Sequence, residues 1–121
     1  METRAFPCTE EGVIGAQAYL EAASAAPKAM VVLDEIVSNI VRCSGASGFT
    51  VGLDQTPEGL KMVFSDDGKP FDPTCEVKEP DVTASAEERD IGGLGIFMVK
   101  KMSRSVAYER RDGQNVLTVV M

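Results

Sequence analysis

The sequence contains no histidine and no tryptophan among its 121 residues. Without histidine, the chain cannot form Ser-His or Cys-His nucleophile pairs, histidine metal sites or phosphohistidine. Cysteine is also scarce, because Cys8, Cys43 and Cys75 lie far apart and form no C-x-x-C pair. We therefore expect neither a disulfide framework nor a structural zinc site.

Basic residues are few, with 12 Lys and Arg against 19 Asp and Glu and a net charge of −7. Nucleic acids and anionic membranes require a basic face, so we expect neither as a partner. An anionic small ligand stays open, because helix N-termini and metal ions supply local positive potential. The sequence has no membrane-length apolar run and no apolar signal segment. We expect one cytoplasmic domain over residues 1–121.

Apolar periodicity predicts helices that alternate with hairpins. Thr9 is the expected N-cap of a helix that runs to about Ala26, and Pro27 is the expected first residue of a second helix. A short edge strand is expected within residues 1–9, a hairpin over 49–54 and 60–65, a helix over 96–102 and a second hairpin over 105–111 and 115–120. This order favours an α+β fold with a mostly antiparallel sheet and helices on one face.

The second helix carries an apolar stripe with two polar residues at its edge. The stripe consists of Leu33, Ile36, Val37, Ile40 and Val41. Glu35 and Asn39 are four residues apart and therefore stack on one flank of the helix. In one interpretation they face a half-buried cleft. In the other they only solvate the helix surface.

Two glycine-containing segments have the character of ligand sites. Asp66-x-Gly68 after a strand can present a carboxylate to an exocyclic amine such as that of adenine, although Asp-Gly turns are also common without a ligand. Residues 92–95, Gly-Gly-Leu-Gly, expose backbone N–H groups at a helix start, which suits phosphates. The alternative is a flexible junction. Residues 74–91 are rich in charge and are expected to form a mobile loop, either a lid or a plain surface loop.

The order of these motifs resembles the GHKL (Bergerat-fold) ATPase superfamily over nearly the whole chain. Residues 33–39, 66–73 and 93–100 are most similar to the anti-sigma-factor serine/threonine kinases of bacteria. That branch has no histidine-bearing dimerisation segment, which agrees with the absence of histidine. The resemblance implies a two-layer α/β sandwich with a mixed, mostly antiparallel sheet.

The resemblance also implies a role for each motif residue. Asn39 matches the asparagine that holds Mg²⁺ against the phosphates of ATP, and Glu35 matches the proposed general base. Asp66 matches the adenine-binding aspartate, and Gly68 the glycine that lets the base approach.

The phosphate end of the implied site lies later in the chain. Gly93 and Gly95 match the glycine box near the phosphates, and Arg89 matches an arginine that some members place near the γ-phosphate.

Three positions depart from the superfamily pattern. Pro70 stands where a glycine is frequent, Cys43 where relatives frequently have histidine, and Asn115 about where many members place a threonine beside the adenine. These changes bear on phosphate transfer more than on nucleotide binding.

The function implied is an ATP- and Mg²⁺-dependent serine/threonine protein kinase of the anti-sigma-factor type. It would phosphorylate a small anti-sigma-factor antagonist protein and regulate transcription by partner switching with a sigma factor or other output protein. The resemblance further suggests a homodimer. Two alternatives are a non-catalytic ATP-binding regulatory module and a detached histidine-kinase-like ATPase domain acting with a separate chain.

Overall fold

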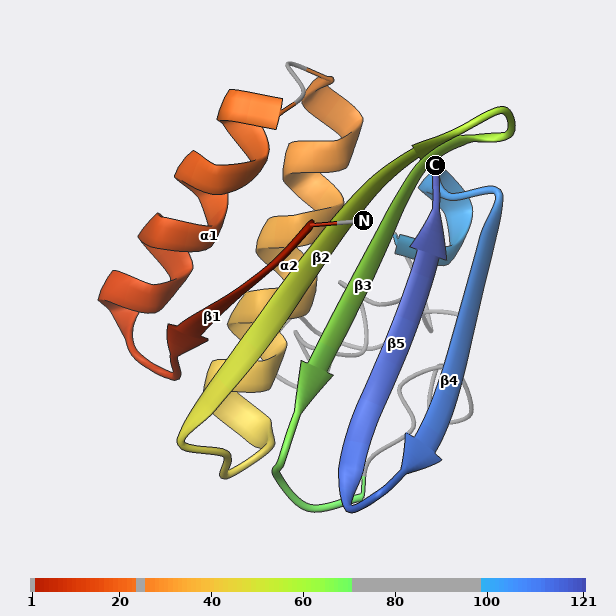
Figure 1. Cartoon of the computed structure of the whole chain (residues 1–121). Helices are drawn as coiled ribbons and strands as arrows, with labels where there is room; N and C mark the ends of the chain where they lie inside the picture. Colours follow the sequence, from red (N-terminus) through yellow and green to blue (C-terminus); the bar gives the residue numbers. More distant parts are fainter. Residues whose placement is uncertain (1, 24–25, 71–98) are drawn as a thin grey trace, which may run out of the picture.

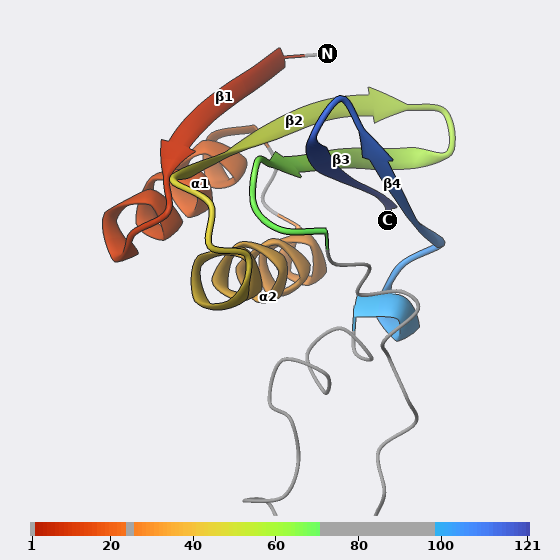
Figure 2. The same cartoon turned by 90° about the horizontal axis from the view of Figure 1, so that it is seen from below.

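The computed structural model describes residues 2–23, 26–70 and 99–121, which form one antiparallel sheet with helices on one face (Figure 1). The elements are β1 (Glu2–Pro7), α1 (Glu10–Ala23), α2 (Pro27–Cys43), β2 (Gly48–Thr56), β3 (Gly59–Asp66), β4 (Ser105–Arg111) and β5 (Gln114–Val120). The sheet order is β1-β2-β3-β5-β4, and each neighbouring pair is antiparallel. Figure 2 shows α1 and α2 on the same side of the sheet, which confirms the predicted α+β class.

Local capping explains where the two helices begin and end. The Thr9 hydroxyl accepts a hydrogen bond from the Gly12 amide at 3.2 Å, which confirms the predicted N-cap of α1. α1 is described as far as Ala23, and residues 24 and 25, which separate it from the predicted end at about Ala26, lie outside the described residues. Ala26 is extended, with φ −70° and ψ 116°, because a residue before proline avoids the α region. Pro27 then opens α2 as predicted.

Both predicted hairpins are present, and only the first turn differs from expectation. β2 and β3 pair as far as Thr56 and Gly59, so the turn contains two residues, Pro57 and Glu58, instead of five. Polar residues continue the ladder there, and a pattern of apolar residues cannot reveal them. The second turn lies at Asp112 and Gly113 as expected, with φ angles of 53° and 77°.

The predicted apolar stripe of α2 forms the centre of the core. Leu33 and Val37 are completely buried and Ile36 is 2% exposed, whereas Val41 is only partly buried at the edge. The inner face of the sheet meets this stripe with buried side chains at Phe49, Val51, Met62, Phe64 and Val119. The stripe therefore fixes the rotation of α2 about its axis, and with it the positions of the polar residues on its flanks.

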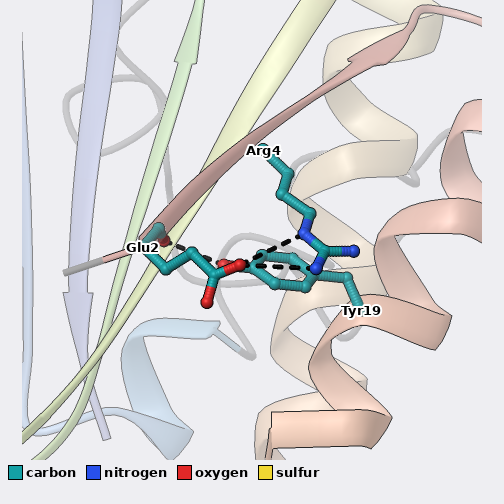
Figure 3. A network of polar contacts seen from close by, with 3 residues as sticks. All are labelled: Glu2, Arg4 and Tyr19. Carbon is teal, nitrogen blue, oxygen red and sulfur yellow. Dashed lines mark hydrogen bonds and ion pairs between the residues drawn. The ribbon is translucent and has the colours of Figure 1, made fainter.

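β1 is the predicted edge strand, and α1 holds it by contacts at both ends of the strand. The Tyr19 hydroxyl donates to the Glu2 carbonyl at 2.9 Å, and the Arg4 guanidinium lies 4.7 Å from the Tyr19 ring centroid (Figure 3). At the other end, a Cβ on Gly12 would lie 1.8 Å from the Pro7 carbonyl oxygen. Only glycine allows the first turn of α1 to come this close to the strand.

Residues 99–102 are helical, in agreement with the end of the predicted helix, and Val99 is buried in the core. The first part of that helix and the predicted loop over 74–91 lie outside the described residues. Among the helices of the described residues, none has the length and apolar character needed to cross a membrane.

Candidate functional site

α2 carries Glu35 and Asn39 on the flank that faces away from α1. Asp34 marks the α1 side, because its carboxylate accepts a hydrogen bond from Gln17 of α1 at 2.7 Å. At 3.6 residues per turn, Glu35 and Asn39 lie about 100° and about 140° around the axis from Asp34. Figure 2 shows α1 on one side of α2 and the helical residues 99–102 on the other. The two candidate residues thus share the flank that the sequence predicted.

Asn39 is buried, with 7% of its surface exposed, and Glu35 beside it is half-buried. Nothing in the described part of the chain forms a hydrogen bond with the Asn39 carboxamide. A buried amide costs free energy unless its polar atoms are satisfied, so an Asn39 side chain that the described residues leave without a partner is suited to a ligand. The carboxamide oxygen of Asn39 is the kind of ligand atom that Mg²⁺ prefers. The residues present therefore fit a metal held at this flank.

A complete protein cage for the metal is not seen. Residues 2–23, 26–70 and 99–121 contain no cluster of three or more Cys, Asp or Glu side chains that could hold an ion. Mg²⁺ commonly keeps waters and binds through one or two protein groups together with substrate phosphates. A site built on Asn39 and a nucleotide's phosphates is of that type.

Asp66 is the last residue of β3 and is only 7% exposed. Its Oδ1 accepts hydrogen bonds from the Gly68 amide at 2.9 Å and from Asn115 Nδ2 at 3.1 Å. No described residue donates to Oδ2. One oxygen of a buried carboxylate is thus engaged by the protein, and the other can accept from a ligand such as an exocyclic amine.

The turn after Asp66 is attached to the end of α2. The Lys69 amide donates to the Ser44 carbonyl at 3.0 Å, and a Cβ on Gly68 would lie 2.3 Å from that same oxygen. Gly68 is therefore required for the close approach to Ser44, a reason that the sequence does not reveal. Ser44 follows Asn39 by five residues, or about 7.5 Å along the helix axis. α2 therefore carries Asn39 and, through Ser44 at its C-terminal end, also anchors the turn that follows Asp66.

Sequence reasoning missed two residues, Tyr108 and Arg110, that hold Asn115, the hydrogen-bond partner of Asp66. The Tyr108 hydroxyl and Arg110 Nη1 both donate to Asn115 Oδ1, at 2.6 Å and 3.2 Å. Arg110 Nη1 also donates to the Gly68 carbonyl at 2.8 Å. A signal was available, because the two-residue turn at 112–113 fixes the hairpin register and places residue 110 opposite Asn115.

Arg89, Gly93 and Gly95, the residues expected at the phosphates, lie outside the described residues. The described part of the candidate site is thus the Glu35 and Asn39 flank of α2 together with Asp66 and Gly68 at the end of β3.

The Cys8 thiol is sensitive to the negative charge of Asp66 and Asp67 at this end of the sheet. Its amide donates to the Ser47 carbonyl at 3.1 Å, which places it beside the connection from α2 to β2. Burial raises the pKa of the Cys8 thiol, and the charges of Asp66 and Asp67 raise it further.

A raised pKa leaves less thiolate near neutral pH, so Cys8 should react with iodoacetamide more slowly than free cysteine at pH 7.5. Asp67→Asn removes one negative charge and should accelerate alkylation, measured by mass spectrometry in a Cys43→Ser, Cys75→Ser background. Glu58→Gln, in the turn at the opposite end of the sheet, is the matched control and should leave the rate unchanged (Figure 1). Equal rates for the two variants would contradict the electrostatic explanation.

Two comparisons with known proteins bear on the family of this chain. The profile of the histidine kinase-like ATPase domain matches residues 12–121. The serine/threonine-protein kinase BtrW of Bordetella bronchiseptica is 30% identical over 90 residues, which cover 71% of this chain and 63% of that protein. The match therefore spans less than two thirds of the relative's length.

Proposed function

The chain belongs to the family of histidine kinase-like ATPase domains, and on that premise we propose that it is an ATP-dependent serine/threonine protein kinase. One observation carries the proposal. Asn39 and Asp66 are each 7% exposed, and each has a polar group that no described residue satisfies. Buried polar atoms without partners are uncommon in folded proteins, and the described residues leave one at each of the two positions that the family resemblance assigns to the metal and to the base.

Each of the three described site residues, Asp66, Asn39 and Glu35, has a chemical role in this proposal. Asp66 Oδ2 accepts a hydrogen bond from the exocyclic amine of adenine, and the Asn39 carboxamide oxygen holds Mg²⁺ at the phosphates. Glu35 lies one helical turn before Asn39 and takes the proton of the attacking hydroxyl. Phosphoryl transfer depends mainly on positioning and on charge stabilisation, so a half-buried carboxylate beside the metal ligand is sufficient protein chemistry. Arg89, Gly93 and Gly95 are proposed to bind the phosphates.

The proposed phosphoacceptor is a serine or threonine hydroxyl on a small anti-sigma-factor antagonist. A sigma factor or another output protein would be the competing partner, and the chain would act in the cytoplasm as one domain, as a homodimer. The relative BtrW is named a serine/threonine-protein kinase, which supports the reaction class.

The test is to purify the chain with its cellular partners, add Mg²⁺-ATP and map the phosphorylated sites. We expect ATP binding and a phosphorylated serine or threonine on a small co-purifying protein. ATP binding without transfer to any partner would instead establish a non-catalytic regulatory module. Phosphohistidine on a separate chain would identify a detached histidine-kinase-like ATPase domain.

A further inference from the structure

Asn115 joins the candidate base site to the edge of the sheet through four hydrogen bonds with side chains and carbonyls of the described residues. Its Nδ2 donates to Asp66 Oδ1 at 3.1 Å and to the Lys69 carbonyl at 2.8 Å. Its Oδ1 accepts from the Tyr108 hydroxyl at 2.6 Å and from Arg110 Nη1 at 3.2 Å. The side chain is 8% exposed, so these bonds lie largely out of water, where a lost partner is costly.

The partners of Asn115 allow only one orientation of its carboxamide. A guanidinium group donates hydrogen bonds and accepts none, so the oxygen of the amide must face Arg110. The two N–H donors then face the two acceptors on the opposite side, Asp66 and the Lys69 carbonyl. Tyr108 and Arg110 of β4 therefore orient the Asn115 carboxamide so that its Nδ2 group faces Asp66. The hydrogen bond from Nδ2 is accepted by Asp66 Oδ1.

We propose that Asn115 is the positioning residue of the base site, held in its working orientation by Tyr108 and Arg110. It engages Asp66 Oδ1 and leaves Oδ2 as the acceptor offered to a nucleotide. The inference rests on the proposed ATP binding and adds a determinant of base selectivity on β4 and β5. Arg110 extends the same restraint to the turn, because it also donates to the Gly68 carbonyl at 2.8 Å.

A fixed acceptor discriminates between purines. The 6-amino group of adenine is a donor and pairs with Oδ2, whereas the 6-oxo group of guanine is an acceptor and opposes it. If Asp66 loses its restraint, the carboxylate rotates and the preference for adenine falls. The ratio of ATP affinity to GTP affinity is therefore the quantity that Tyr108 and Asn115 should control.

Tyr108→Phe tests this with the smallest change, because it removes one hydroxyl and keeps the ring. We expect ATP to bind about 2- to 10-fold more weakly with GTP affinity unchanged, so that the ratio falls by the same factor. Displacement of a fluorescent adenine nucleotide by ATP and by GTP measures both affinities. The matched control is Tyr19→Phe, which removes the other tyrosine hydroxyl and its 2.9 Å bond to the Glu2 carbonyl (Figure 3). That variant should keep the wild-type ratio.

Asn115→Asp is a second variant that keeps the side-chain shape and places an acceptor against Asp66. We expect it to bind ATP about 10-fold more weakly at pH 8, while its melting temperature shows whether it is folded. An unchanged ATP-to-GTP ratio in Tyr108→Phe would overturn the inference even if Asn115→Asp fails to fold. If the wild-type chain binds no ATP, the proposed function fails first and the inference fails with it.

Discussion

Replacing Glu35 with glutamine should reduce phosphate transfer about 10²- to 10⁴-fold, the usual contribution of a general base. Glutamine preserves the shape and one acceptor oxygen of the side chain but cannot take a proton. ATP affinity should stay within a few-fold of wild type, because the proposed role of Glu35 begins only in the transition state. Glu35 takes part in neither of the two ion pairs found among the described residues, so loss of its charge should not unfold the domain. Radiolabel transfer to the purified partner measures the rate.

The neighbouring carboxylate provides the control for this experiment. Asp34→Asn makes the same change of charge on the same helix, but Asp34 faces α1 and accepts a hydrogen bond from Gln17. Its transfer rate should stay within about 2-fold of wild type if the change leaves the fold intact. Wild-type transfer by Glu35→Gln would remove Glu35 from the proton-transfer step and leave only nucleotide binding for this flank of α2.

The sequence predicted best what local periodicity determines. The 3.6-residue period of α2 places five apolar residues toward the sheet, so the shared flank of Glu35 and Asn39 follows without any tertiary information. The Asp112-Gly113 turn likewise determines the hairpin of β4 and β5. The predicted boundaries failed where polar residues continue a ladder, at Thr56.

Parts of the candidate site could not be predicted because they depend on contacts between distant segments. A helical projection places Asn39 and Glu35 on the same flank of α2, yet Asn39 is buried and Glu35 is only half-buried. The need for glycine at position 68 arises from Ser44, which lies 24 residues earlier in the sequence. Tyr108 belongs to an ordinary alternating strand, and its contact with Asn115 is local to the hairpin of β4 and β5. Its bearing on Asp66 arises only because β5 also pairs with β3, where Asn115 lies opposite Asp66.

Replacing Asp66 with asparagine should weaken ATP binding by about 1.5–3 kcal/mol, which is about 10- to 150-fold, because a charge-assisted hydrogen bond is lost. The Gly68 amide and Asn115 Nδ2 both donate to Oδ1, so the oxygen of the new carboxamide should occupy that position. Its NH₂ group then replaces Oδ2 and presents a donor to the donor of adenine. The same group suits the 6-oxo acceptor of guanine, so GTP affinity should not fall. Calorimetry with each nucleotide measures both effects.

Asp67→Asn is the matched control, because it removes the same charge one residue later, where the side chain is exposed. Its ATP affinity should stay within about 2-fold of wild type, since exposed charges interact weakly through water. The comparison separates the hydrogen bond of a buried carboxylate from the general negative potential of this end of the sheet. If both variants lose ATP affinity equally, the effect is electrostatic and nonspecific. If neither loses affinity, Asp66 does not contact the base, and the nucleotide must be recognised by other residues.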